Sequence, residues 1–367
     1  MMWKCCRNNS LLLAAVLALA ASATARAQWG GGQSRWQNIL DNSDDFYGSD
    51  ESVRVAESVL LYQNDNGGWP KNIDMARRLS DSQKDQLRKN HNRSETLIDN
   101  GATWTQIRYL ARMHEATGEE RFAAAVRRGI EYLLAAQYAN GGWPMIYPLR
   151  RGYYSHITFN DGAMMGVMEL LRDASRGKRP FEFLDTDLRA RCGRAIDKGL
   201  DAVLKCQVVV DGRPTAWCAQ HDEVTFQPRD ARTFEPVSLS GYESVGVVAY
   251  LMKIDNPDPE IKRAIEGAVA WFNEVKIEGL RVDWVRDPES GRRIDRVAIE
   301  DPSAGPLWAR FYEIGTNRPM YVGRDGVVRE RMADIERERR LGYAWLGDWP
   351  RKMLETKYPT WQQKWSQ

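Results

Sequence analysis

An eight-residue segment that occurs twice constrains this chain more than any other feature of its sequence. The first copy is Gln63-Asn-Asp-Asn-Gly-Gly-Trp-Pro70 and the second, 74 residues later, is Gln137-Tyr-Ala-Asn-Gly-Gly-Trp-Pro144. Each copy follows an amphipathic helical segment and ends it, because Asn and Gly stop helices. A fixed period of this length predicts a repeated helix pair that buries its apolar face against neighbouring pairs. The sequence therefore predicts a toroid or barrel of helix pairs with the Gly-Gly-Trp-Pro corners on one rim.

The first 27 residues have the pattern of a secretory signal peptide. Lys4 and Arg7 precede the apolar run 11–20, and Ala25-Arg-Ala27 forms a cleavage site of the A-x-A type. The apolar run is too short to span a membrane. We therefore expect residues 28–367 to form a single domain that is secreted or periplasmic and has no membrane partner.

Charge and cysteine content limit the classes of partner. The whole chain carries a formal charge of +2, and the basic residues of the signal leave the rest at −1, so a nucleic-acid partner is not expected. Of the three cysteines outside the signal, Cys192 and Cys206 lie on one predicted helix and cannot bridge. Cys206 and Cys218 could form a disulfide, and buried free thiols are the equal alternative. No zinc-binding spacing is present.

Helical periodicity is strong along most of the chain. The expected helices are 53–62, 102–116, 119–137, 162–174, 188–207, 241–254, 260–275 and a last one at 329–346. Segments 208–238 and 276–330 are not periodic, although 319–322 is strand-like, and loops of that length in a compact domain are usually functional. Residues 28–50 read as a mobile lead-in.

The corner segments admit two interpretations. The pattern Gln-x-x-x-Gly-x-Trp is similar to that of squalene–hopene and related terpene cyclases, which are α/α toroids. Those enzymes need an Asp-x-Asp-Asp acid motif, and this chain has none. We therefore interpret the corners as mainly architectural. Lys71 directly follows the first corner, where it could reach a cleft or be solvated.

Two aspartates precede two of the inner helices of the repeat. Asp99 begins Asp-Asn-Gly-Ala-Thr103 and Asp161 lies in Asn160-Asp-Gly-Ala-Met164, at points that we interpret as equivalent. Each could simply cap its helix by accepting a backbone N–H. If both instead face the rim, the two carboxylates suit glycosidic acid–base chemistry or a Ca²⁺ site, with oxygens of Asn100 and Asn160 beside them.

Arginines gather in the non-periodic loops. The segment Pro228-Arg-Asp-Ala-Arg-Thr-Phe-Glu-Pro236 precedes an inner helix, and Arg310, Arg318 and Arg324 follow in the next long loop among aromatic residues. Such a segment is usually a solvated loop. Guanidinium groups also bind carboxylates in a bidentate manner, so this pattern suits a polyanionic sugar with regularly spaced carboxylates.

Together these stretches resemble the pectate lyases of polysaccharide lyase family 10. The matching segments are 63–72, 96–106, 137–147, 158–165, 217–236 and 301–349, which cover essentially the whole chain after the signal. Asp-Ala-Arg-Thr-Phe-Glu-Pro is highly specific, whereas the corner repeat alone is not. The resemblance implies a partly open α/α toroid that degrades polygalacturonate by Ca²⁺-dependent anti β-elimination.

The resemblance also assigns roles to residues of this sequence. Arg232 matches the catalytic base, and Asp99 and Asp161 match the acidic residues of the calcium and substrate site. Arg310 and Arg324 look like substrate-binding arginines, and we add Asn100 and Lys71 to the expected substrate contacts. An arginine base requires a lowered pKa, because Arg normally stays protonated. His221, which titrates near neutrality in water, is the competing candidate for the base.

The sequence thus predicts an all-α toroid of helix pairs with long irregular loops and a few short strands, acting as a monomeric, exported pectate lyase. One alternative is a glycoside hydrolase on the same scaffold with Asp99 and Asp161 as acid and base. The other is a pectin-binding protein without catalysis. Formation of an unsaturated product separates the lyase from both.

Overall fold

The computed structural model describes residues 36–90 and 95–365. The expected signal peptide lies outside these residues. The α-helices are α2 (Asp44–Tyr47), α3 (Asp50–Tyr62), α4 (Asp81–Lys89), α5 (Trp104–Thr117), α6 (Glu120–Ala136), α7 (Ala163–Ser175), α8 (Thr186–Cys206), α9 (Glu243–Leu251), α10 (Pro259–Glu274), α11 (Arg337–Gly342) and α12 (Tyr358–Trp365). Helices dominate, so the predicted helical class is confirmed.

The described strands are short, apart from one hairpin. They are β1 (Ile157–Thr158), β2 (Val209–Val210), β3 (Arg213–Pro214), β4 (Gln220–His221), β5 (Leu239–Ser240), β6 (Leu280–Arg286), β7 (Arg293–Glu300), β8 (Trp308–Ala309), β9 (Phe311–Tyr312), β10 (Pro319–Val322), β11 (Val328–Arg329) and β12 (Leu346–Gly347). Four of them form one sheet in the order β11-β10-β9-β5, and β6 pairs with β7 as an antiparallel hairpin. The strand predicted at 319–322 is confirmed as β10.

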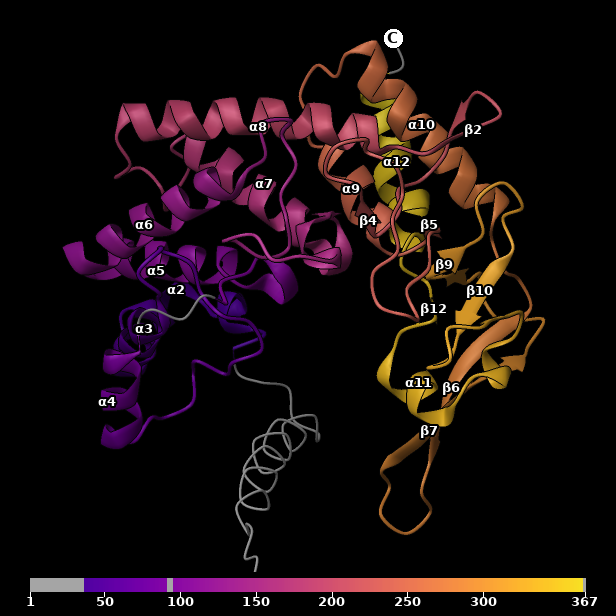
Figure 1. Ribbon diagram of the computed structural model, residues 1–367, viewed down its shortest axis with the longest axis horizontal. Coiled ribbons are helices and arrows are strands. Elements are labelled where there is room, and N and C mark those ends of the chain that lie inside the picture. Colours follow the sequence, from indigo (N-terminus) through magenta and orange to yellow (C-terminus); the bar gives the residue numbers. More distant parts are fainter. Residues whose placement is uncertain (1–35, 91–94, 366–367) are drawn as a thin grey trace, which may run out of the picture.

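Helices pair along the chain in two layers. In the inner layer, α5 contacts α7 and α7 contacts α9. In the outer layer, α3, α6, α8 and α10 contact one another in that order, and each of the pairs α5–α6, α7–α8 and α9–α10 is packed together. Figure 1 shows α8 running along one edge of the molecule above α7, with the labelled strands and α11 on the right of the view. The repeated helix pair predicted from the corners is therefore present.

Each corner glutamine joins one outer helix to the next. The side-chain amide Nε2 of Gln63 donates to the carbonyl oxygens of Gly67 and Ala125, both at 2.9 Å, and Ala125 belongs to α6. Gln137 repeats this with a residue of α8, and Gln207 with a residue of α10. The glutamines are therefore architectural, because each ties one stacked unit to the next by satisfying a backbone carbonyl that is at least partly buried.

Each corner tryptophan satisfies a carbonyl at the end of an outer helix. The last carbonyl groups of a helix have no hydrogen-bond donor within the helix. At four places among the described residues, an indole N–H donates to one of these carbonyls. The pairs are Trp69 with Val59 of α3, Trp143 with Leu133 of α6, Trp217 with Val203 of α8 and Trp308 with Phe272 of α10, at 2.7–2.8 Å. The chain therefore has a fourth corner, at Trp308, with the β6–β7 hairpin inserted before it.

The corner glycines are required by close approach of the next helix. A Cβ atom added at Gly141 would lie 1.9 Å from the carbonyl oxygen of Lys198 in α8, and the φ angle of Gly141 is +98°. Gly67 shows the same relation to Arg128 in α6, at 2.3 Å. Any other residue would push the stacked units apart.

Two expectations about the ends of the chain are wrong. Residues 329–346 do not form one helix, and they contribute instead to β11, α11 and β12. The reason is that this Arg- and Glu-rich segment lacks the apolar stripe that a helix buries against a core. The lead-in is also packed from residue 36 onward, since Trp36, Ile39 and Tyr47 are buried in the core. Arg112 fixes it by donating to the carbonyl oxygen of Leu40 at 2.9 Å.

The cysteines in the part of the chain that the structure describes are free thiols. Cys192, Cys206 and Cys218 are buried and unbridged, so the free-thiol alternative holds and the Cys206–Cys218 disulfide is absent. Over residues 36–90 and 95–365, no helix is both long and apolar enough to cross a membrane.

Candidate active site

A groove of about 950 Å³ brings together residues from the first two inner-helix starts, the loop before α9 and the segment around α11. Its lining includes all seven residues predicted for the site: Lys71, Asp99, Asn100, Asp161, Arg232, Arg310 and Arg324. These residues are far apart in sequence, so the repeat architecture and the long loops together assemble the groove.

Two carboxylates form its centre, linked by one amide. Asn160 Nδ2 donates to Asp99 Oδ1 at 3.3 Å and to Asp161 Oδ2 at 2.9 Å. The Lys71 ammonium group binds the other oxygen of Asp99. Asp99 is buried, whereas the Asp161 side chain is 35% exposed. The pair therefore offers hard oxygen donors at the wall of a solvent-accessible groove.

The two aspartates are not at equivalent points of the repeat, contrary to expectation. The 3₁₀ turns Asp99–Gly101 and Asn160–Gly162 have the same length, and in each the middle residue has a left-handed backbone conformation. These middle residues are Asn100 (φ 51°) and Asp161 (φ 48°). Asp161 thus corresponds to Asn100, and Asp99 to Asn160. This offset by one residue allows both carboxylates to meet the same amide. The helix-capping alternative fails as well, because α5 and α7 have no side-chain cap.

Arg310 closes the acidic centre from the fourth corner. Its Nη2 donates to Asp161 Oδ1 at 3.0 Å, to Asn160 Oδ1 at 3.3 Å and to Glu243. Burial opposes the charge on Arg310, but Glu243 and Asp161 outweigh it, so its pKa is raised. Burial also raises the pKa of the Glu243 carboxyl, although Arg310 acts in the opposite direction. Three carboxyl groups, those of Asp99, Asp161 and Glu243, thus lie beside two cations, Lys71 and Arg310.

Arg232 lines the same groove and is held by Glu235. Its Nε donates to Glu235 Oε2 at 2.8 Å and its Nη2 donates to Oε1, while Nη1 has no protein partner among the described residues. The hydrogen bond with Glu235 raises the pKa of Arg232, rather than lowering it as an arginine base requires. The Arg232 side chain is 46% exposed, so it can be reached from the groove. Tyr343 orients Glu235 through a hydrogen bond of 2.9 Å.

His221 does not serve as an alternative base in this arrangement. It is fully buried and does not line the groove. Its Nε2 accepts from the Cys218 amide at 3.1 Å, so its Nδ1 donates to the Phe226 carbonyl at 2.8 Å. Burial lowers its pKa to about 4. Both ring nitrogens therefore have structural roles.

The remaining predicted contacts lie at the edges of the groove. Arg324 pairs with Glu338 at 2.6 and 3.1 Å and is 55% exposed. Asn100 Nδ2 donates to Asn72 Oδ1 at 3.0 Å. Exposed pairs of this kind are weak and can exchange partners with a charged ligand.

Sequence reasoning named Asn160 beside the aspartates but missed four residues that line the groove, Tyr153, Glu235, Arg339 and Tyr343. It also missed the buried Glu243, which binds Arg310. Glu235 stands in the Thr-Phe-Glu-Pro segment and Glu243 at the third inner-helix start, so both had a local signal. Arg339 and Tyr343 had none, because they lie in a segment expected to be one long helix.

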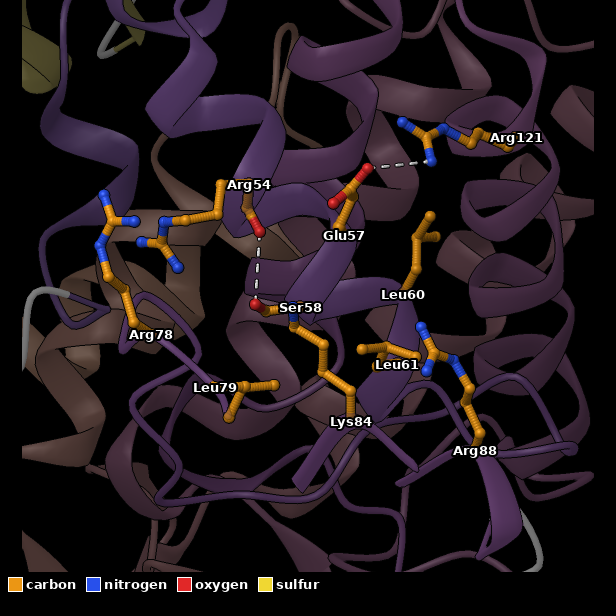
Figure 2. Close-up of a pocket in the computed structure, with 10 residues that line it drawn as sticks. All are labelled: Arg54, Glu57, Ser58, Leu60, Leu61, Arg78, Leu79, Lys84, Arg88 and Arg121. Carbon is orange, nitrogen blue, oxygen red and sulfur yellow. Dashed lines mark hydrogen bonds and ion pairs between the residues drawn. The ribbon is translucent and has the colours of Figure 1, made fainter. Parts of the chain in front are cut away.

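A second cavity, of about 460 Å³, lies between α3, α4 and the start of α6 (Figure 2). Five cations line it, and each has a carboxylate partner: Arg54 and Arg78 with Glu51, Lys84 with Asp81, Arg88 with Asp85, and Arg121 with Glu57 and Glu119. None of the predicted site residues is there. The groove, with its acidic centre and flanking arginines, is therefore the candidate site.

Comparisons with known proteins agree with this choice. The family model described as pectic acid lyase matches residues 63–354. A mutant of the family 10 polysaccharide lyase from Cellvibrio cellulosa in complex with trigalacturonic acid is 34% identical, with a TM-score of 0.74 over 85% of this chain and 92% of that one. The family 10 polysaccharide lyase from Cellvibrio cellulosa is 33% identical, with a TM-score of 0.74 over 88% and 95%. A comparison with curated proteins found no match.

Fold, groove and comparisons define a lyase that acts on a polysaccharide. The chain belongs to the pectic acid lyase family, whose model covers most of its length. The resemblance inferred from the corners and from the Asp-Ala-Arg-Thr-Phe-Glu-Pro segment is therefore confirmed, and so is the predicted class of enzyme, a pectate lyase.

Proposed function

We propose that this enzyme cleaves 4-linked α-galacturonan by Ca²⁺-dependent anti β-elimination, with Arg232 as the base. The observation that carries the proposal is one groove in which Asp99 and Asp161 face Arg232 and Arg310. A relative with trigalacturonic acid bound supports the choice of substrate. A polymer of uronates presents a carboxylate on every sugar, which suits a groove lined by cations.

The acidic centre fits a calcium ion. Asp99 and Asp161 would hold it, since Ca²⁺ prefers carboxylate and amide oxygens. Lys71 and Arg310 now pair with these carboxylates, and the Asp161 side chain remains 35% exposed, so a cation can reach it from the groove. The described residues contain no cluster of three metal-binding side chains, so substrate carboxylates and water would supply the remaining ligands. Bound there, Ca²⁺ would withdraw electrons from the substrate carboxylate and so stabilise an anion at C5.

In the proposed elimination, the proton and the electrons that leave C5 each have a defined acceptor. In its neutral form, Arg232 takes the C5 proton through Nη1, the nitrogen that Glu235 leaves free. The C5–H electrons form the C4–C5 double bond, the C4–O bond breaks, and the leaving sugar oxygen takes a proton from solvent. The Arg232–Glu235 pair favours the protonated guanidinium, so catalysis requires that this pair loosen when substrate enters.

Four residues would bind the sugar chain. Arg310 is fixed beside Asp161 and can support the carboxylate of the reacting sugar. Lys71, Asn100 and Arg324 can turn from their present partners toward further carboxylates and hydroxyls. As part of the same proposal, residues 28–367 form one catalytic domain, a partly open α/α toroid. It acts as an exported monomer after removal of residues 1–27, without a nucleic-acid or membrane partner.

The test is the ultraviolet absorbance of the unsaturated product from polygalacturonate, with added Ca²⁺ and then with excess chelator. We expect a Ca²⁺-dependent rise that the chelator stops and that Arg232→Ala reduces by roughly three orders of magnitude or more. New reducing ends without absorbance would instead indicate a hydrolase with Asp99 and Asp161 as acid and base. Binding without either signal would indicate a pectin-binding protein.

A further inference from the structure

Cations dominate the lining of the second cavity, the space between α3, α4 and the start of α6 (Figure 2). Glu57 is the one carboxylate among its described lining residues, and the cations are Arg54, Arg78, Lys84, Arg88 and Arg121. The carboxylates that pair with the first four of these cations do not belong to the lining. Cations gathered in a hollow give it a positive potential that attracts anions.

Three of these cations are held only by exposed ion pairs. Lys84 Nζ lies 3.3 Å from Asp81, whose side chain is 97% exposed. Arg88 Nη1 lies 2.7 Å from Asp85, whose side chain is 63% exposed. The side chain of Arg78 is itself 79% exposed. Because such pairs contribute little free energy, the carboxylate of a ligand can take the place of the protein carboxylate.

The packing of α4 does not explain why its cations face the cavity. Leu87 is the one buried residue of this helix. Lys84 and Arg88 are four residues apart, so they lie on the same side of α4, and both line the cavity. A helix that packs on the body of a protein ordinarily turns apolar residues toward it. Two long cations on this side keep a space open that apolar side chains would fill.

Three half-buried leucines, Leu60, Leu61 and Leu79, supply the apolar part of the lining. Ligand sites commonly combine apolar surface with a few charged groups that fix the ligand. The C–H face of a sugar ring can lie on the leucines while guanidinium groups bind its carboxylate. A small inorganic anion would use the cations alone, so the combination favours an acidic sugar.

We propose that the second cavity is a further binding site for galacturonan, which holds one stretch of the polymer while another stretch lies in the groove. The proposal rests on the proposed function and deepens it. Lys71 of the groove and Arg78 of the cavity are seven residues apart in the sequence, so at most about 25 Å of extended chain separates them. A long polymer reaches both sites, and binding at two linked sites raises its apparent affinity.

The experiment compares the wild type with a cavity variant that combines Arg78→Gln, Lys84→Gln and Arg88→Gln. A control variant combines Arg127→Gln, Arg179→Gln and Arg191→Gln, which removes the same charge from ion pairs that line neither the groove nor the cavity. KM for polygalacturonate is measured at low ionic strength and at about 0.5 M salt. Trigalacturonate is added as a competitor for the groove, and thermal unfolding reports stability. Calorimetry with polygalacturonate in excess chelator measures binding without turnover.

We expect the cavity variant to raise KM for polygalacturonate about fivefold at low ionic strength, because the second site no longer holds the polymer. Most of this difference disappears at about 0.5 M salt, which screens exposed charges. Trigalacturonate inhibits the wild type and the cavity variant at the same concentration, since the short chain reports the groove alone. In chelator, the cavity variant binds polygalacturonate more weakly than the wild type does. The control variant matches the wild type throughout.

Equal KM values for the wild type and the cavity variant would overturn the proposal. An equal rise in the control variant would do the same, because net charge alone would then explain the effect. Weaker inhibition of the cavity variant by trigalacturonate would also count against it, since the groove itself would then be altered. If the cavity variant does not fold, Arg88→Gln alone decides by the same measurements.

Failure of the proposed function gives a different result. If the wild type forms no unsaturated product, that function fails, and calorimetry still tests the cavity. No binding of polygalacturonate by the wild type, or equal affinity of wild type and cavity variant, then overturns the inference. Weaker binding of the cavity variant to vesicles of anionic phospholipid, with polygalacturonate binding unchanged, overturns it as well, because the cavity would then serve a membrane surface.

Discussion

At the scale of single residues, several charged side chains of the groove already form ion pairs with protein side chains of opposite charge. Asp99 is paired with Lys71, Arg232 with Glu235, and Arg324 with Glu338. A polyuronate can replace the protein carboxylates in such pairs, because it offers the same group at regular spacing. The pair at Arg232 has a further consequence, since it determines the protonation of the proposed base.

Replacing Glu235 by Gln should shift the pH dependence of the reaction. Glu235 favours protonated Arg232, so its removal lowers the pKa of Arg232 and increases the neutral fraction at any given pH. We expect the rising limb of the kcat profile to move to lower pH by roughly one to three units. The maximal rate falls as well, because Arg232 loses the bond that orients it. Initial rates from pH 6 to 11 measure both effects.

The matched control for that experiment is Glu338→Gln, which removes the partner of Arg324. Since Arg324 is proposed to bind substrate and not to take the proton, this variant should alter KM without moving the limb. A Glu235→Gln profile that keeps its limb would mean that Arg232 is not the titrating base.

The groove residues could be found from sequence where a local pattern marked them. Asp161 and Arg232 lie in distinctive short segments, and the structure brings both to one groove. Arg339 could not be found in this way, because it is distinguished by a missing partner that only the folded chain defines. The offset between Asp99 and Asp161 was visible in the sequence, but only the backbone turns give it meaning.

At the scale of elements, the fourth corner connects the helical scaffold to the substrate groove. Trp308 ends α10 as the other corner tryptophans end their helices, and Arg310 follows two residues later. The β6–β7 hairpin, inserted before this corner, contacts α11. Asp295 of β7 binds Arg340 of α11 through two hydrogen bonds, at 2.6 and 2.9 Å. The hairpin thus braces the helix that carries Arg339.

We predict that Asp295→Asn weakens the enzyme from outside the groove. Losing the partly buried pair should cost about 1 kcal/mol of stability and raise KM severalfold by loosening α11. Arg340 lowers the pKa of Asp295, so the stabilisation is complete above the unfolded pKa, about 4, and is lost as pH falls through the lower folded value. Thermal unfolding of both proteins at pH 7 and below pH 3 should show the difference at pH 7 only.

Asp334→Asn is the control for this prediction, because its partner Arg331 is 78% exposed and such surface pairs contribute little. A melting temperature and KM for Asp295→Asn equal to those of the control would mean that the hairpin does not support α11.

Helices of the repeat could be predicted because their apolar residues recur with helical period. The range 53–62 corresponds to α3 and 188–207 to α8, with ends shifted by a few residues. The fourth corner could not be predicted, since its tryptophan follows the helix only after a long insertion. The segment 329–346 was misread because charge patterning alone does not specify a helix without an apolar face to bury.

At the scale of the whole molecule, stacking of units holds residues 36–90 and 95–365 together, and no disulfide links them. The corner glutamines tie each outer helix to the next, and one continuous core runs from Trp36 to Trp361. An enzyme that we propose to be exported thus keeps three cysteines reduced. Their protection must come from burial, because a disulfide-forming compartment would otherwise oxidise them.

Burial therefore predicts how the thiols respond to reagents. It raises the pKa of Cys192 to about 12 and that of Cys206 and Cys218 as well, so little reactive thiolate forms at neutral pH. With residues 28–367, a colorimetric thiol reagent should find almost no reactive thiol in the native enzyme and all three after unfolding in denaturant. Added reductant should leave the melting temperature unchanged, since no bond is there to break. A count of one thiol after unfolding would instead show that Cys206 and Cys218 are bridged, and the melting temperature would then fall in reductant.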